Sequence, residues 1–214
     1  MNISVIIPTL DNPEDVFDVI KSLNQQILLP SEIIIVDSSS KDDIDNLSKN
    51  IDSEIPITYA RFGRAYRNDR LIMMIKALPI IKYFFQSNIK GRASPYEATN
   101  YGSLIAKNEW LAFLDATTIP KKNWIKDYVE IIKSNKAEIV FGSTKYLAQT
   151  FFQKILRAST YGANRIETAP GSLMRRKDFL NGFKITEGVR SGGDVDWKNR
   201  VRSNFRSFTP KKTY

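Results

Sequence analysis

The stretch that decides the fold is Trp110-Leu111-Ala112-Phe113-Leu114-Asp115-Ala116-Thr117-Thr118-Ile119-Pro120. An apolar run leads here into a carboxylate, two hydroxyl side chains and a proline. A run that is so short and so apolar predicts a strand buried on both faces, as in a parallel sheet. A carboxylate at the end of such a strand lies where open α/β sheets bind their ligands. Asp115 is therefore a candidate ligand-binding residue, and the alternative is that it only caps the next turn.

Strand and helix patterns alternate along the first part of the chain. Apolar runs predict strands at 3–7, 32–36 and 55–59, with helices at 13–23 and 42–49 between them. This β-α-β-α-β order is the repeating unit of a parallel sheet. The expected fold class is α/β, with a mostly parallel central sheet flanked by helices.

The second part continues with the same kinds of pattern over a single expected domain, residues 1–214. Ser94 and Glu97 form a capping box, with a proline at the first helical position. The patterns predict helices at 95–107, 121–134, 149–161 and 177–181, strands at 137–141 and 172–175, and a last helix that opens within 191–197.

A long apolar and basic segment, 71–85, interrupts the alternation. One interpretation is that it docks on an anionic membrane, because aromatic and aliphatic residues mix there with lysines. The other is that it forms a helix packed on the core, with Pro79 as a kink. The arginines that precede it could neutralise a diphosphate or form a solvated face: Arg61, Arg64, Arg67 and Arg70.

The composition excludes several kinds of chemistry. The 214 residues include no cysteine and no histidine, so thiol nucleophiles, Ser-His-Asp catalysis and the common zinc sites are excluded. Acid–base chemistry near neutral pH must then rest on carboxylates, lysine or tyrosine. We expect a cytoplasmic protein, because no signal peptide and no membrane-spanning run is visible.

The net charge of +9 is unevenly distributed. Residues 1–60 carry a net charge of −8, and residues 151–214 carry +9. A basic second half indicates an anionic partner, such as a phosphorylated substrate, a membrane surface or nucleic acid, and the alternative is a solvated basic face without a partner. We expect no nucleic acid, because the basic residues of the last segment are not interleaved with stacking aromatic residues.

Polar residues follow three of the predicted parallel strands. Thr9 and Asp37 come just after the first two strands, and Asp115 follows the strand at 110–114. The carboxyl ends of parallel strands meet at one edge, so these side chains should face a common ligand. Carboxylates accept hydrogen bonds from ribose hydroxyls and base N–H groups, and they bind Mg²⁺ or Mn²⁺. Neither a dinucleotide-binding glycine motif nor a P-loop is present.

An ordered set of motifs resembles the family 2 glycosyltransferases, which have the GT-A fold. The matching pieces run over nearly the whole chain: 3–12, 33–40, Asn100-Tyr101-Gly102, Phe113-Leu114-Asp115 to Pro120, Pro170-Gly171, Gly182-Phe183, and Asp194-Val195-Asp196-Trp197 to Arg200. The resemblance implies inverting transfer of a sugar from a nucleotide-sugar donor to a hydroxyl of a glycan or a lipid-phosphate acceptor. It also allows a peripheral position on the inner face of the membrane.

The resemblance assigns roles to individual residues. Pro8, Thr9 and Asp37 would line the nucleoside pocket, and Asp115 would begin the D-x-D motif that binds metal and donor. Residues 1–115 would form the nucleotide-binding half and residues 116–214 the acceptor-binding half. Asp194 would deprotonate the acceptor hydroxyl.

The D-x-D motif departs from the family pattern, because Thr117 stands in place of the second aspartate. The metal, Mn²⁺ or Mg²⁺, would then rest on Asp115, with a neutral oxygen from Thr117. This departure also motivates an alternative, a non-catalytic protein that keeps the fold and a nucleotide or partner site.

The residues around Asp194 suit a catalytic base. Gly192 and Gly193 precede it and let the backbone come close to a ligand. Without histidine, a carboxylate is the natural acceptor of the hydroxyl proton. The alternative is that Asp194 only caps the last helix.

Overall fold

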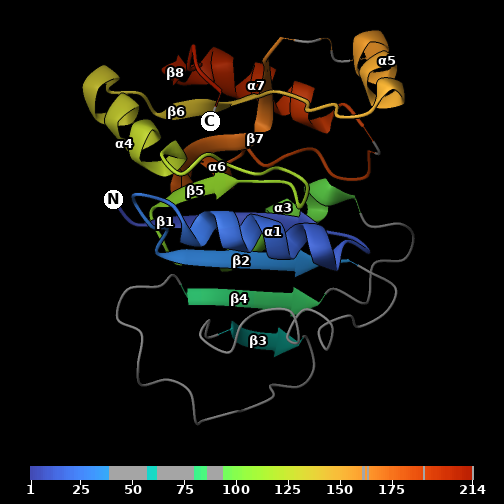
Figure 1. Cartoon of the computed structure of the whole chain (residues 1–214). Coiled ribbons are helices and arrows are strands. Elements are labelled where there is room, and N and C mark those ends of the chain that lie inside the picture. Colours follow the sequence, from blue (N-terminus) through green and yellow to red (C-terminus); the bar gives the residue numbers. More distant parts are fainter. Residues whose placement is uncertain are drawn as a thin grey trace.

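The central feature of the protein is one eight-stranded sheet, seen in a computed structural model (Figure 1). The structure describes residues 1–38, 57–61, 80–85, 94–160, 162, 164–189 and 191–213. The helix expected at 42–49 and three of the four arginines between 61 and 70 lie outside these residues, as does the side chain of the fourth, Arg61.

The strand order is β3-β4-β2-β1-β5-β7-β6-β8. All neighbouring pairs are parallel except those of β7, which runs antiparallel to both β5 and β6. The expected α/β class with a mostly parallel sheet is thus confirmed. The strands are β1 (Ile3–Thr9), β2 (Glu32–Asp37), β3 (Ile57–Arg61), β4 (Ile80–Phe85), β5 (Trp110–Phe113), β6 (Ile139–Thr144), β7 (Ile166–Arg175) and β8 (Ser207–Phe208).

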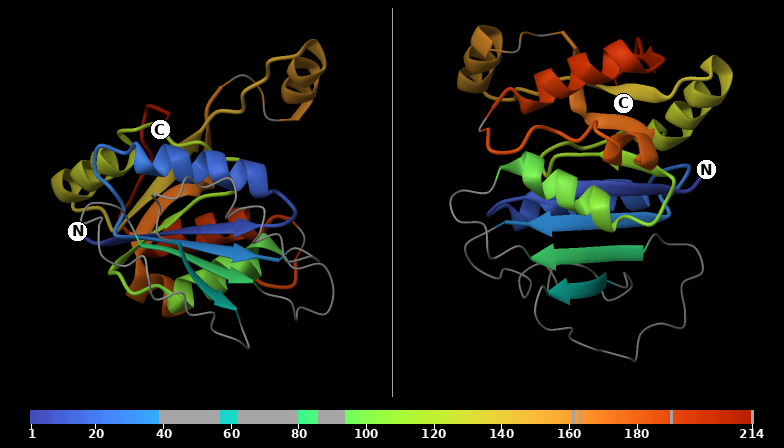
Figure 2. Two further views of the ribbon diagram at one scale, coloured as in Figure 1. Left: turned by 60° about the horizontal axis from the view of Figure 1, so that its bottom comes forward. Right: turned by 180° about the vertical axis from the view of Figure 1, so that it is seen from behind.

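Helices cover both faces of this sheet (Figure 2). Helices α1 and α4 pack on one face, and α3, α6 and α7 pack on the other. α5 contributes no residue to either core cluster. The helices are α1 (Pro13–Asn24), α3 (Pro95–Ile105), α4 (Trp124–Asn135), α5 (Phe151–Thr160), α6 (Arg176–Leu180) and α7 (Gly193–Asn204).

The strand that decides the fold is buried on both faces, as its sequence predicts. Trp110 and Ala112 of β5 belong to the core cluster under α1 and α4, whereas Leu111 and Phe113 belong to the cluster under α3 and α7. This alternation follows from the two-residue period of a strand. β5 therefore fixes the position of the polar turn that follows it, starting with Asp115.

The main difference from the sequence-based expectations lies in the segment 71–85, whose last six residues form a strand. Residues 80–85 form β4, which pairs in parallel with β2 on one side and with β3 on the other. The expectation of a helix is wrong for these six residues. A strand between two partners has its backbone groups satisfied by the sheet, which the local apolar and basic pattern does not reveal.

Three strand boundaries also differ from expectation. β3 continues to Arg61 rather than ending at Tyr59, and β7 begins at Ile166 rather than at Ser172. β6 continues through Gly142 to Thr144, with an irregular register between Val140 and Gly142. A side chain at Gly142 would overlap the backbone of β7, since a Cβ there would lie 1.9 Å from the Pro170 carbonyl oxygen.

In the part of the chain that the structure describes, no helix is both long and apolar enough to cross a bilayer.

Candidate active site

Two buried hydroxyls mark the edge at which the parallel strands end, the carboxyl edge. Thr9 ends β1 and lies opposite Asp37, which ends β2. The Oγ atoms of Thr9 and of the next residue, Ser38, are buried and have no hydrogen-bond partner among the described residues. Asp37 is only 2% exposed, and Pro8 is buried within β1. The edge thus offers polar atoms that a bound ligand can satisfy.

Asp115 follows β5 at the same edge and starts a tight turn. Leu114 still bonds to β1 through its N–H, and the Asp115 carbonyl accepts a hydrogen bond from the Thr118 N–H at 3.0 Å. Asp115 is exposed as a residue, yet the protein atoms packed around its carboxyl raise the pKa of Asp115 to about 6. Loss of hydration is the larger cause, and the negative charge of Asp194 is the second. Thr117 is exposed in the turn.

Asp194 lies in the first turn of α7, close enough to Asp115 for their charges to interact. The helix is capped by Gly192, whose φ of +82° is the left-handed region that favours glycine. No side chain caps this end of α7, so the alternative of Asp194 as the N-cap is wrong. Its carboxylate still benefits from the positive end of the helix.

Tyr96 holds Asp194 from the opposite helix. Its hydroxyl donates a hydrogen bond to Oδ1 of Asp194 at 3.3 Å. Burial raises the pKa of Tyr96, and the charge of Asp194 raises it further, so the phenol keeps its proton. Gly193 makes this contact possible, because a Cβ there would lie 2.7 Å from Cε2 of the Tyr96 ring.

The loop that leads to Asp194 is fixed on α3. Asn100 is 4% exposed; it donates to the Ile185 carbonyl at 2.8 Å and accepts from the Ile185 N–H at 3.1 Å. Its Nδ2 also donates to Glu187 at 2.9 Å. Glu97 of the capping box accepts from the Gly188 N–H at 3.1 Å with its second oxygen. α3 thus positions both the loop and, through Tyr96, its carboxylate.

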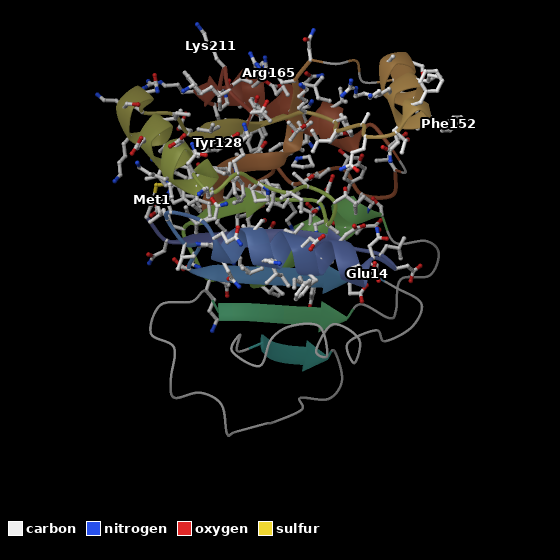
Figure 3. All side chains as sticks on the ribbon, in the orientation of Figure 1. Met1, Glu14, Tyr128, Phe152, Arg165 and Lys211 are labelled. Carbon is white, nitrogen blue, oxygen red and sulfur yellow. The ribbon has the colours of Figure 1, made fainter. Side chains whose placement is uncertain are left out.

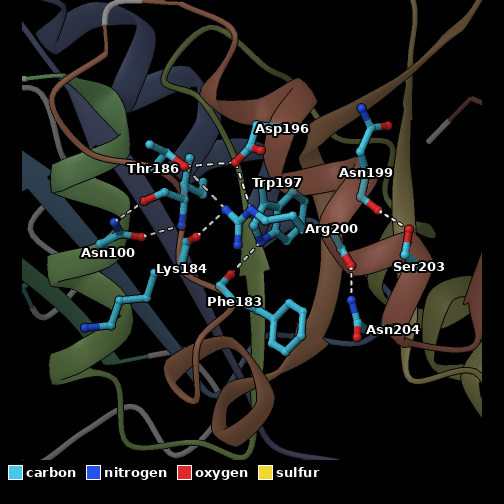
Figure 4. Close-up of polar contacts among 11 residues, drawn as sticks. Asn100, Phe183, Lys184, Thr186, Asp196, Trp197, Asn199, Arg200, Ser203 and Asn204 are labelled. Carbon is cyan, nitrogen blue, oxygen red and sulfur yellow. Dashed lines mark hydrogen bonds and ion pairs between the residues drawn. The ribbon is translucent and has the colours of Figure 1, made fainter.

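Asp196 contacts Thr186 and Arg200 (Figure 4), neither of which contacts Asp194 through a hydrogen bond among the described residues. Arg200 donates to it at 2.8 Å and Thr186 at 2.9 Å, and these hydrogen bonds hold the pKa of Asp196 below its usual range. Arg200 also donates to the Lys184 carbonyl at 2.8 Å. Asp196 and Arg200 therefore hold α7 against the loop before it, and we call these contacts with Thr186 and Lys184 the clasp.

The carboxylates of the site do not form a complete metal-binding cluster. Within the described residues there is no group of three or more acidic side chains placed to hold a metal ion. Asp115 could supply one ligand and Thr117 a neutral oxygen, which is a small set for a hard divalent cation. The negative charges of Asp115 and Asp194 repel each other, and a bound cation would reduce this repulsion.

Sequence reasoning named four residues at strand ends and Asp194 as candidate site residues, and it gave no role to the groups that contact or adjoin them. The structure brings Pro8, Thr9, Asp37 and Asp115 to one edge and Asp194 close to Asp115. Sequence reasoning had assigned no role in the site to Ser38, Tyr96 or Asn100. The capping box at Ser94 indicated that a helix begins there, but nothing local showed that Tyr96 meets a residue 98 positions away.

The chain belongs to glycosyl transferase family 2. Residues 4–67 and 66–183 match the family described as Glycosyl transferase family 2. The match covers β1, β2, the turn at Asp115 and β7, and it ends just before the loop that carries Asp194. The recognition of this family from the sequence is confirmed.

Two relatives carry related names. An uncharacterized glycosyltransferase of Haemophilus influenzae is 24% identical over 98% of this chain and 65% of its own length. Glycosyltransferase AglE of Haloferax volcanii is 22% identical over 97% of this chain and 63% of its own length. The chain therefore spans somewhat less than two thirds of either relative.

Solved structures share the fold. S. aureus TarS 1–349 superposes with a TM-score of 0.69 at 18% identity, covering 100% of this chain and 59% of that one. The complex of TarS 1–349 with UDP-GlcNAc gives a TM-score of 0.65 at 19% identity, covering 57% of that chain. At this identity the likeness shows the common fold of the two proteins.

Proposed function

We propose that this protein transfers a sugar, with inversion, from a nucleotide-sugar donor to a hydroxyl of a glycan or lipid-linked acceptor. The observation that carries the proposal is that the Asp115 and Asp194 carboxylates lie close enough for their charges to interact, near the edge where the Thr9 hydroxyl has no partner among the described residues. Family membership and the UDP and UDP-GlcNAc complexes of TarS support the choice of donor.

The donor would lie along the first half of the chain, residues 1–115. Thr9 and Asp37, with Pro8 fixing the backbone just before Thr9, would contact the nucleoside, because a buried hydroxyl and a carboxylate suit ribose and base hydrogen-bonding groups. Asp115 would face the diphosphate. Two negative groups cannot approach without a counter-charge, so a cation is expected there.

A divalent cation such as Mn²⁺ or Mg²⁺ would neutralise the diphosphate when bound. Asp115 is the residue that would hold it, assisted by Thr117, and phosphate oxygens would complete the coordination. With so few protein ligands, we expect the metal to bind measurably only together with the nucleotide.

Asp194 would act as the base. It takes the proton from the acceptor hydroxyl as that oxygen bonds to the anomeric carbon, while the bond from this carbon to the diphosphate oxygen breaks. The electron pair of the broken bond leaves with the nucleoside diphosphate. The acceptor would lie against the second half of the chain, residues 116–214, which carries the excess positive charge.

A thermal-shift series against nucleotide sugars, with and without Mn²⁺, tests the donor part of the proposal. A ligand at about 100 times its dissociation constant should stabilise the protein by roughly 2.7 kcal/mol. Unchanged melting with every nucleotide tested would contradict the assignment.

A second candidate is a non-catalytic family member that binds a nucleotide or a partner. The exposed threonine at position 117, in place of an acidic residue, favours it. Slow hydrolysis of a bound donor in the absence of acceptor would exclude this candidate, and binding without any turnover would support it.

The site of action is part of the proposal. We propose a cytoplasmic protein that sits peripherally on the inner face of a membrane, where a lipid-phosphate acceptor would be presented. Membrane contact by residues 71–79 stays a prediction, since they lie outside the described residues. Residues 80–85 are committed to the sheet as β4.

A further inference from the structure

Helix α5 carries the largest exposed apolar surface among the described helices. Phe151 is 78% exposed, Phe152 75% and Leu147, just before the helix, 83%. Ile155 and Leu156 are also exposed, and no residue of α5 is buried. We call these five residues the α5 patch. A water-facing surface of this kind normally marks an interaction site.

The helix is amphipathic by its own sequence. The apolar positions 151, 152, 155 and 156 fall on one side of a 3.6-residue period, and Gln153, Lys154, Arg157 and Thr160 fall on the other. In a helix that covers a core, the apolar side would be buried. Here α1, α3, α4, α6 and α7 already cover the two faces of the sheet, so the patch of α5 has a different use.

α5 stands away from the body of the protein. It projects beyond the end of the sheet at which β1, β2 and β4 finish, and two views show the same displacement (Figures 1 and 2). Phe152 lies on the side of α5 that faces away from the sheet (Figure 3). The patch therefore lies on the same side of the molecule as the carboxyl edge, which carries Asp115.

The charge around the patch identifies the chemistry of its partner. Between Lys145 and Ile166 the chain has four basic residues and no acidic one. The basic members are Lys145, Lys154, Arg157 and Arg165. A partner must therefore offer apolar volume for the patch and negative charge for its flanks. A bilayer that contains anionic lipids offers both at the depth that an interfacial helix reaches.

The loop before α5 is attached to the helix. The Arg157 guanidinium donates to the Tyr146 carbonyl at 3.2 Å, and Gln153 accepts from the Gln149 N–H at 2.9 Å. These bonds hold the loop that carries Leu147 to the helix, so the loop and helix can enter an interface as one unit. A symmetric contact with a second copy is disfavoured, because it would bring the basic flanks of both copies together.

We propose that α5 and its preceding loop dock on an anionic lipid bilayer. Docking turns the carboxyl edge toward the membrane surface, where a lipid-linked hydroxyl would be within reach. The docking itself does not depend on the transfer reaction, so it can be tested without a substrate.

Flotation with vesicles of phosphatidylcholine, with and without phosphatidylglycerol, tests the proposal. The wild-type chain should float with the mixed vesicles at low salt, and binding should weaken in high salt. Replacing both phenylalanines, Phe151→Ser with Phe152→Ser, should lower the partition coefficient by at least about tenfold. Lys154→Gln should weaken binding to the mixed vesicles alone.

Two matched controls make the outcome decisive. Ile27→Ser removes an apolar side chain that is 61% exposed, and Lys133→Gln removes an exposed lysine of α4. Both should bind vesicles as the wild type does. Equal binding by the Phe151/Phe152 variant and the wild type, or no flotation of the wild type, would overturn the proposal. A concentration-dependent dimer in sedimentation that the double variant abolishes, without lipid binding, would assign the patch to a second copy instead.

Discussion

The hydroxyl of Tyr96 donates a hydrogen bond to Oδ1 of Asp194 at 3.3 Å and thereby joins the first turns of α3 and α7. The same helix α3 fixes the preceding loop through Asn100 and Glu97. The side chain proposed to remove the acceptor proton is thus held by a helix far from it in sequence. These contacts fix its position through the fold, which is what catalysis by a positioned base requires.

Tyr96→Phe should lower kcat while the affinity for the donor nucleotide stays unchanged. The variant keeps the ring but removes the hydroxyl that donates to Oδ1 of Asp194 at 3.3 Å. Losing one hydrogen bond that positions the proposed base should cost about tenfold in kcat. Steady-state kinetics and calorimetry measure the two effects. Unchanged kcat would show that Asp194 does not depend on Tyr96 for its position.

Gly193→Ala should also impair the reaction, because the added methyl group would displace the Tyr96 ring. The new Cβ would lie within 2.7 Å of the Tyr96 ring and would push the phenol away from Asp194. The effect should disappear when the ring is absent, so Gly193→Ala should cost little in a Tyr96→Ala background. A double-mutant cycle measures this coupling. Ser191→Ala, two residues earlier and exposed, is the control and should be silent.

Asp115→Asn should inactivate the protein and stabilise it at neutral pH. The pKa of Asp115 is about 6 in the folded protein and near 3.8 when unfolded. Between these values the folded state binds more protons, so the contribution of Asp115 to stability falls as pH rises through this window. The variant should melt at a higher temperature than wild type at pH 7, with the difference vanishing below about pH 4.

The control for this experiment is Asp18→Asn on the exposed side of α1, which should leave the melting temperature at pH 7 unchanged. A carboxylate that costs stability and is retained for activity is the usual signature of a functional group. Lower stability of Asp115→Asn at pH 7 would contradict the linkage. Activity should also fall as the pH drops below about 6, because a neutral Asp115 loses its attraction for a cation.

Thr9→Val should separate folding from binding. The two side chains have nearly the same shape, and the Oγ of Thr9 is buried without a partner among the described residues. Removing an unsatisfied hydroxyl should stabilise the unliganded protein by about 1 kcal/mol. The same change should weaken nucleotide binding, measured by calorimetry, if the nucleoside satisfies this hydroxyl. Unchanged affinity for every nucleotide that binds wild type would remove Thr9 from the pocket.

The sequence predicted the elements whose partners are implied by local pattern. Strongly apolar runs such as Trp110 to Phe113 predict buried strands because every residue in them faces a core. The strand at residues 80–85 was not predicted by the same reasoning. A strand that contains Lys82 is recognisable only from its pairing with β2 and β3. The first part of β7, from Ile166, is likewise specified by its pairing with β6.

Only part of the candidate site was predictable from the sequence, namely the residues at strand ends. Residues at strand ends follow from topology, because parallel strands bring their ends together. Tyr96 and Asn100 were not predictable, because their contacts join residues that are 98 and 85 positions apart in the chain. Local sequence carries no signal for such contacts.

The two aspartates of α7 should respond differently to the same substitution. Asp194→Asn keeps the shape of the side chain but removes the proton acceptor, so kcat should fall by roughly 10²–10⁴ with donor affinity preserved. Asp196→Asn should instead loosen the clasp with Arg200 and Thr186, which lowers the melting temperature while catalysis continues. Steady-state kinetics and thermal melts on both variants measure the contrast. Near wild-type turnover by Asp194→Asn, together with a dead Asp196→Asn, would show that the base is the other carboxylate. Full activity in both would mean that this loop does not activate the acceptor.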